Sequence, residues 1–159
     1  MININNAVQF QHLIWDRIMK SASVVVDATC GNGHDLLYLA ERAQSECHLY
    51  GIDIQEQAVS ASRELLASKK LQSNVTITFL HNSHDIALHQ EIKENTIDLI
   101  IFNLGYLPGG DHSIITRPHN TIEALNNAFP KLAKDGIITI VAYPGTPEGM
   151  EEKEALHKY

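Results

Sequence analysis

Residues 27–33 read DATCGNG and follow the apolar run Ser23–Val26 directly. The run has the β-branched composition of a buried strand. Beyond it, glycines allow the backbone to approach a ligand closely, and the helix expected next offers free N–H groups. The stretch therefore predicts a strand–turn–helix unit that binds a nucleotide-like ligand, and a tight turn without any ligand is the alternative.

Four more apolar runs follow, separated by segments with helical periodicity. Strands buried on both faces of a parallel sheet have this composition, and their alternation with helices predicts an α/β, Rossmann-like, doubly wound and mostly parallel fold. We expect Pro130 to end the fourth helix and Asp135-Gly136 to turn the chain into the last strand. The further strands are expected at 48–53, 75–80, 97–102 and 137–142, and helices at 5–20, 35–43, 55–68, 118–129 and from about 148.

The bulk properties indicate one globular domain over residues 1–159. Hydrophobic residues make up 44% and charged residues 19%, and the net charge is −7. A net negative charge argues against broad contact with nucleic acid and favours a small substrate or a short RNA element. The two cysteines predict reduced thiols in a cytoplasmic protein, and no apolar run reaches the roughly 20 residues that span a bilayer. Because no strand-like run follows residue 142, we expect the C-terminal strands of such a fold to be missing from this chain.

The second run ends in Asp53, twenty residues after Gly33. A carboxylate there can accept both ribose hydroxyls of a nucleoside, although it can also cap the helix that begins near Gln55. A dinucleotide fingerprint would need a glycine where Leu36 stands, which disfavours NAD and favours S-adenosylmethionine. The predicted cofactor-binding residues are Asp27, Thr29, Gly31, Asn32, Gly33, Asp35, Asp53, Ile54, Gln55, His84 and Asn103.

The segment after the third run, residues 81–85, is expected to border the adenine, with His84 or Asp85 in contact with the base. Helix capping by Ser83 or Asp85 explains the same residues. His81 and His84 are three apart, but no Cys or Glu completes a metal-ligand set, so we expect no metal site.

The fourth run ends in Asn103-Leu104-Gly105-Tyr106, which resembles the [Asn/Asp]-Pro-Pro-[Tyr/Phe] motif of amino-group methyltransferases. In that motif the Asn oxygen and a following carbonyl accept hydrogen bonds from the target amine, while the aromatic ring stacks on the base. Asn103 and Tyr106 are therefore the predicted catalytic residues. Leu104 and Gly105 replace both prolines, and a glycine-rich loop that merely leaves the sheet is the alternative.

Two loops complete the predicted substrate side of the site. The loop from Pro108 to Pro118 carries Asp111, His112 and Arg117, and the loop after the last strand begins with Tyr143. Polar loops of this length in compact domains are more often functional than idle. We predict that Asp111, Arg117 and Tyr143 contact the substrate, Arg117 through a phosphate.

Three stretches together, 27–35, 51–58 and 103–111, resemble a bacterial family of class I methyltransferases known as rRNA methylases. Members are linked to tRNA wobble-uridine modification, in which they methylate the amine of 5-aminomethyl-2-thiouridine. The resemblance implies S-adenosylmethionine as cofactor, tRNA (its anticodon region) as substrate and a homodimer. Two features depart from the family: Pro144 and Thr146 stand where it has histidines, and family members continue into further strands.

Other functions stay open at this point. An rRNA or small-molecule methyltransferase uses the same cofactor site. An NAD-dependent oxidoreductase is disfavoured by Leu36, and a non-catalytic partner subunit by the intact glycine turn and Asp53. No Cys lies near the fourth run, so covalent attack on a pyrimidine ring has no candidate nucleophile.

Overall fold

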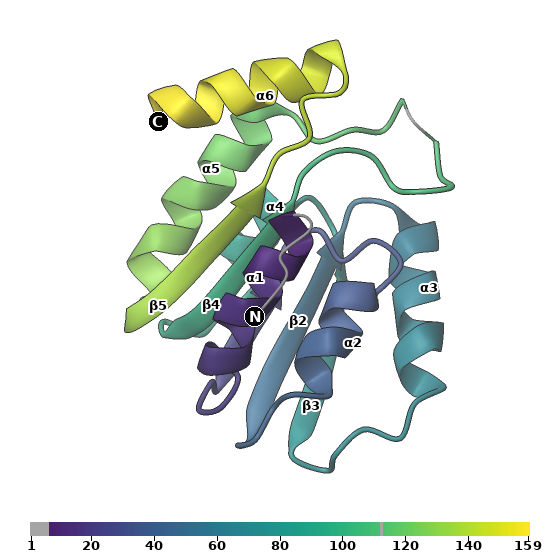
Figure 1. The fold of residues 1–159 in the computed structure, drawn as a ribbon, viewed down its shortest axis with the longest axis vertical. Coiled ribbons are helices and arrows are strands. Elements are labelled where there is room, and N and C mark those ends of the chain that lie inside the picture. The colour runs from purple at the N-terminus through teal and green to yellow at the C-terminus, as the bar shows by residue number, and fades with distance from the viewer. Residues whose placement is uncertain (1–6, 112) are drawn as a thin grey trace, which may run out of the picture.

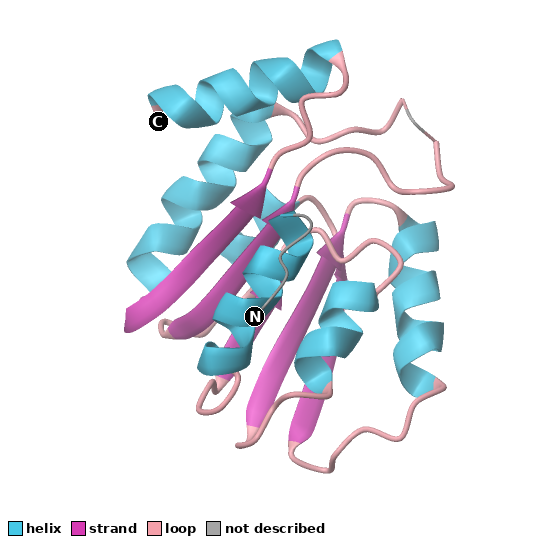
Figure 2. Ribbon diagram, viewed as in Figure 1, coloured by secondary structure: helices cyan, strands magenta, loops and turns pink. Residues whose placement is uncertain are grey.

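The structure, a computed structural model, describes residues 7–111 and 113–159. Its centre is a five-stranded, fully parallel sheet in the order β3-β2-β1-β4-β5 (Figures 1 and 2). The predicted α/β, Rossmann-like fold is confirmed. The strands are β1 (Val24–Asp27), β2 (Cys47–Asp53), β3 (Val75–His81), β4 (Ile97–Asn103) and β5 (Leu132–Val141).

Helices cover both faces of this sheet, and each face has its own apolar cluster (Figure 1). On one face Trp15, Leu36 and Leu66 pack against strand residues such as Leu99. This layer holds α1 (Ala7–Ile18), α2 (His34–Ala40) and α3 (Glu56–Ala67). The opposite face is covered by α4 (His84–Ile86), η1 (Ala87–Glu91), α5 (Pro118–Ala128) and η2 (Phe129–Lys131), and α6 (Pro147–Lys158) packs on α5.

The last strand differs from its prediction. β5 begins at Leu132, so Asp135-Gly136 lies inside the strand and does not turn the chain into it. Ile97 pairs with Leu132 while Leu99 pairs with Ile137, so residues 133–136 form a bulge against β4. A Cβ at Gly136 would lie 2.7 Å from the carbonyl oxygen of Ile97. The glycine that suggested a turn is there because two backbones approach closely.

The helix boundaries differ from the predictions by a few residues. Pro118 begins α5, and the helix ends at Ala128, two residues before Pro130. The helix predicted at 5–20 is α1, described from Ala7; positions 5 and 6 lie outside the described residues. Among the described residues, no helix combines the length and the apolar character needed to cross a membrane.

Candidate cofactor and substrate site

A cavity of about 600 Å³ opens at the carboxyl edge of the strands, where ligands bind in open α/β sheets. Segments that follow β1, β2, β3, β4 and β5 all contribute to its wall. Of the predicted site residues, those lining it are Thr29, Gly31, Asn32, Asp35, Asp53, Ile54, Gln55, His84, Asn103, Tyr106, Arg117 and Tyr143. Asp27, Gly33 and Asp111 do not line it.

The glycines of the turn after β1 have different tasks. Gly31 has φ +49° and lines the cavity. The N–H of the preceding residue, Cys30, donates to the Ile52 carbonyl at 2.8 Å and ties the turn to β2. Gly33 has φ +83°, and a Cβ there would lie 2.8 Å from the Cα of Ser62. Gly31 thus shapes the ligand wall, whereas Gly33 allows α2 to start close to α3.

Asp53 joins two of the loops around the cavity. Its carboxylate accepts hydrogen bonds from the backbone N–H of Gly31 at 3.0 Å and of Gln55 at 2.9 Å. Burial raises the pKa of Asp53, while these backbone N–H groups oppose the rise. The carboxylate therefore supports the turn before α3 and also lines the cavity, while the N-cap residue of α3 is Gln55 and not Asp53.

Asp27 is buried beneath the same turn. One carboxylate oxygen accepts from the Thr29 N–H at 3.1 Å, and the other has no hydrogen-bond partner among the described residues. Burial, and then the nearby charge of Asp35, raises the pKa of Asp27 well above the usual aspartate value. The residue supports the turn from below the cavity wall.

After β3, His84 and Asp85 point in different directions. His84 is buried and lines the cavity, its ring meets Phe102 edge-on with centroids 5.6 Å apart, and burial lowers its pKa. Its Nε2 has no partner in the described part of the chain. Asp85 instead accepts from Asn120 at 3.3 Å, on α5, and does not line the cavity. Of the two residues only His84 lines the cavity, and its contact with the base stays a prediction.

Around the histidines after β3, the described residues offer no group of metal ligands. His81 donates from Nε2 to the Ile54 carbonyl at 3.0 Å. Within residues 7–111 and 113–159, no three His, Cys, Asp or Glu side chains are grouped as a metal ion would need.

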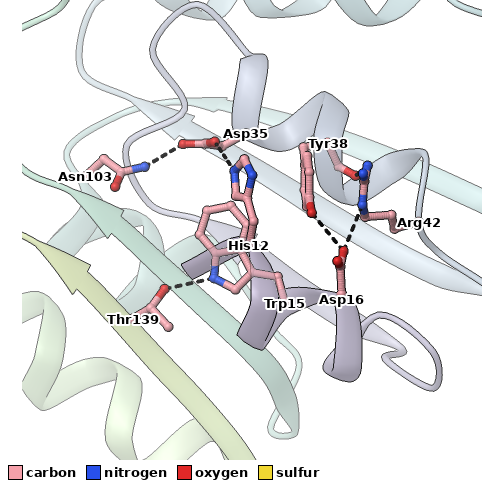
Figure 3. Close-up of polar contacts among 8 residues, drawn as sticks. All are labelled: His12, Trp15, Asp16, Asp35, Tyr38, Arg42, Asn103 and Thr139. Carbon is pink, nitrogen blue, oxygen red and sulfur yellow. Dashed lines mark hydrogen bonds and ion pairs between the residues drawn. The ribbon is translucent and has the colours of Figure 1, made fainter. Parts of the chain in front are cut away.

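Asn103, at the end of β4, is held on two sides. Its backbone N–H donates to Thr29 Oγ1 at 2.7 Å. Its side-chain Nδ2 donates to Asp35 Oδ2 at 2.6 Å, as Figure 3 shows. Its Oδ1 is buried and has no hydrogen-bond partner among the described residues. A buried acceptor without a donor costs free energy, which makes this oxygen a strong candidate for a ligand contact.

Two tyrosines and an arginine form the outer wall near Asn103. Tyr106 is 43% exposed and Tyr143 51% exposed, and both line the cavity with Arg117. Burial, and then the charge of Asp35, raises the pKa of Tyr143. Asp111 instead accepts from the N–H of Ser113 at 2.8 Å within its own loop, and His112 lies outside the described residues.

Side chains that the sequence did not single out support this half of the site. His12, on α1, donates to Asp35 at 3.2 Å. Glu152, on α6, is buried and accepts from Thr116 and Thr121 at 2.6 Å each. Nothing in the spacing of the sequence indicates these bonds, because each one joins side chains more than 20 positions apart.

Comparison with known proteins shows which family the chain belongs to. The family model described as "Putative rRNA methylase" matches residues 49–159. The chain belongs to this family. Solved structures described as rRNA methylases are among those that it resembles. A "putative rRNA-methylase" of Clostridium thermocellum is 38% identical with a TM-score of 0.88, and the match covers 99% of this chain and 82% of that one.

Two further relatives of this chain have descriptions that name a ligand or a substrate. SMU.1697c, a "putative methyltransferase" of Streptococcus mutans solved in complex with SAH (S-adenosylhomocysteine), is 30% identical with a TM-score of 0.82, over 98% of this chain and 81% of that one. The chloroplastic tRNA (mnm(5)s(2)U34)-methyltransferase of Arabidopsis thaliana is 33% identical over 96% of this chain. The chain spans 58% of that plant protein's length. The SAH in the Streptococcus mutans structure is the product form of S-adenosylmethionine and indicates S-adenosylmethionine as the cofactor.

Proposed function

We propose that this chain is an S-adenosylmethionine-dependent N-methyltransferase that methylates the amine of 5-aminomethyl-2-thiouridine at the wobble position of tRNA. The observation that carries the proposal is the Asn103 amide. Its Nδ2 is bound by Asp35, so its buried Oδ1 is left to accept a hydrogen bond from a donor that the described chain does not provide. A primary amine is such a donor.

The residues around the cavity fit the cofactor. Asp53 has carboxylate lone pairs left after its two backbone bonds and can accept ribose hydroxyls, as a strand-end carboxylate does in nucleoside sites. Ile54, 58% exposed, and His84, with its unpartnered Nε2, are suited to an adenine. The backbone at Gly31 leaves room for the amino-acid end. Bound S-adenosylmethionine supplies an electrophilic methyl group on a positively charged sulfur.

The substrate side must present an amine lone pair in line with that methyl group. Asn103 accepts one N–H of the amine and so directs the nitrogen, and Tyr106 and Tyr143 provide aromatic surface for the base. Alignment of nucleophile and leaving group supplies much of the acceleration in such displacements. Arg117 is the candidate contact for a tRNA phosphate.

The comparisons support a tRNA substrate through the plant relative, whose name specifies position U34 of tRNA, and an rRNA substrate through the family description. We favour tRNA because the side chain of 5-aminomethyl-2-thiouridine is an aliphatic amine, which matches the free acceptor at Asn103. An rRNA target is the second candidate.

The test is methyl transfer to tRNA that carries 5-aminomethyl-2-thiouridine, run beside the same tRNA without the aminomethyl group. We expect methylation of the first tRNA alone, with 5-methylaminomethyl-2-thiouridine found by mass spectrometry of the nucleosides. Equal methylation of both tRNAs would mean that the amine is not the target, and methylation of ribosomal RNA alone would favour the second candidate.

We also propose that the protein is a cytoplasmic homodimer. β5 is an edge strand of the described sheet, and its Ile137 and Ile140 are each 37% exposed. Exposed apolar edge strands favour association. Light scattering at micromolar concentration should give twice the mass of the chain, and a monomer mass would contradict the proposal.

A further inference from the structure

We propose that His12 and Asp35 are positioning residues that fix the direction of the Asn103 amide, so that its oxygen and not its nitrogen meets the substrate amine. The inference rests on the proposed function, because it concerns how the acceptor for that amine is oriented. It assigns a role in the site to α1, which contains none of the sequence motifs at 27–35, 51–58 and 103–111.

The first step is the bond between Asn103 and Asp35. An amide side chain can turn over and exchange its oxygen and nitrogen, which would place two N–H donors in front of the substrate amine. A carboxylate only accepts, so the group that faces Asp35 Oδ2 at 2.6 Å must be the Asn103 NH₂. Asp35 thereby determines which end of the amide is available on the other side.

The second step is the bond between Asp35 and His12. The other carboxylate oxygen, Oδ1, accepts from His12 Nε2 at 3.2 Å. With one oxygen bound by a histidine and the other by an asparagine, the carboxylate is fixed in its plane. The same bond assigns the proton of the His12 ring to Nε2, because the carboxylate has none to donate.

The third step is the support for His12 itself. Its ring stacks on Tyr38 of α2 with centroids 3.7 Å apart and lies 4.9 Å from the ring of Trp15. Trp15 is fully buried and donates from its indole nitrogen to Thr139 of β5 at 3.1 Å (Figure 3). The contacts that run from β5 through α1 to β4 hold the His12 ring rigidly. A side chain can orient another one only if it is itself held in place.

A matched pair of variants separates the hydrogen bond from the packing. His12→Phe keeps an aromatic ring on Tyr38 but removes the donor, whereas His12→Gln places an amide N–H near the former Nε2. We expect kcat for methyl transfer to fall roughly tenfold in His12→Phe and to recover to within about threefold of wild type in His12→Gln. The dissociation constant of S-adenosylhomocysteine should change less than about twofold in both, because His12 does not line the cavity.

Asp16→Asn is the control for a general disturbance of α1. Asp16 lies one turn further along the helix and also joins α1 to α2, accepting from Tyr38 Oη and Arg42 Nε at 2.8 Å each (Figure 3). It has no bond to Asp35 or Asn103, so kcat should be unchanged.

A second readout does not need any turnover. The ¹⁵N-attached side-chain protons of Asn103, assigned by their absence in Asn103→Ala, should exchange slowly with water in the wild type. The exchange should become faster in Asp35→Asn and in His12→Phe, but not in Asp16→Asn.

The outcomes distinguish this inference from the proposed function. A wild type that leaves the aminomethyl tRNA unmethylated would contradict the proposed function. The exchange rates of the Asn103 side-chain protons would still test whether His12 and Asp35 fix the orientation of the Asn103 amide. A wild type that methylates this tRNA while His12→Phe keeps full kcat would overturn the positioning alone. Equal losses in His12→Phe and His12→Gln would overturn it as well, since the donor would then be irrelevant.

Discussion

The cofactor half and the substrate half of the cavity are built by different kinds of bonds. At the ends of β1 and β2, the carboxylate of Asp53 is held by backbone N–H groups of the turns themselves. At the end of β4, Asn103 is held through side chains 74 and 68 positions away in the sequence, those of Thr29 and Asp35. Backbone N–H groups are present whatever the sequence, whereas side-chain partners can be removed singly.

This difference has a consequence for how each half responds to substitution. The cofactor half should tolerate most side-chain changes outside its glycines, Asp53 and the residues proposed to face the adenine, Ile54 and His84, since its other donors belong to the main chain. The substrate half should be sensitive to changes in distant helices, because α1 holds Asp35 and α6 holds Thr116. Activity and cofactor affinity should therefore separate when the two halves are mutated in turn.

The largest effect is expected for Asn103→Ala. Removal of the acceptor should lower kcat by about 100-fold, because the amine is then no longer directed at the methyl group. The affinity for S-adenosylhomocysteine, measured by isothermal titration, should change little. A variant with full activity would move the amine-holding role to another residue of the substrate half.

The matching change in the cofactor half is Asp53→Ala. We expect binding of S-adenosylhomocysteine to weaken by about 1–3 kcal/mol through the loss of charge-assisted hydrogen bonds. Asp53→Asn keeps an acceptor oxygen and should lose less. Isothermal titration measures both, and equal affinities in the wild type and Asp53→Ala would remove Asp53 from the cofactor site.

The reach of α6 into the substrate half is tested by Glu152→Gln. Its carboxylate accepts from Thr116 Oγ1, and Thr116 Oγ1 in turn accepts from the Gly105 N–H at 2.8 Å, two residues beyond Asn103. An amide at this buried position offers one acceptor in place of two and adds unmatched donors. We expect the free energy of unfolding to fall by about 1–3 kcal/mol and kcat to fall with it.

Glu151→Gln is the control, because Glu151 neighbours Glu152 on the same helix and is exposed. Chemical denaturation should show no change for it beyond about 0.5 kcal/mol. If cofactor affinity fell in Glu152→Gln as strongly as kcat, the separation of the two halves would be wrong.

The same division governs what the sequence could predict. The approximate positions of the strands, the glycine turn and Asp53 follow from local patterns: an apolar run, the glycines after it and the acidic residue at the end of a strand. His12 gives no such signal, because its role depends on a contact with Asp35, 23 positions away, that exists only in the folded chain. Asp111 and Asp85 do not line the cavity, because a polar residue in the expected loop can bond to its own backbone or to a neighbouring helix.

The bulge in β5 shows the limit of turn signals in strands. Asp135-Gly136 has the composition of a turn, but Gly136 is required by its distance to the Ile97 carbonyl on the neighbouring strand. Only the pairing of β4 with β5 reveals this. Local composition therefore located the strand but placed its start five residues too late.

The last prediction concerns Asp27 and the pH dependence of stability in the cofactor half. The pKa of Asp27 is raised in the folded chain, chiefly by burial and then by the charge of Asp35. The folded state therefore keeps a proton that the unfolded chain releases near the usual aspartate pKa of 3.8. Above that value the folded state binds more protons than the unfolded one, so the contribution of Asp27 to stability is lost as pH rises through its folded pKa.

Asp27→Asn removes this titration with little change in shape. The amide oxygen can still accept from the Thr29 N–H, and the new NH₂ takes the place of the carboxylate oxygen that has no partner among the described residues. Urea denaturation of both proteins from pH 4 upward should show that wild-type stability falls relative to the variant, with a slope of at most about 1.4 kcal/mol per pH unit for one proton. Asp35 and Asp53 are present in both proteins, so the difference between the two curves reports Asp27 together with its interaction with these two carboxylates. Parallel curves would show that the folded chain holds no extra proton on Asp27, and the cofactor half would then carry two buried negative charges supported by backbone N–H groups alone.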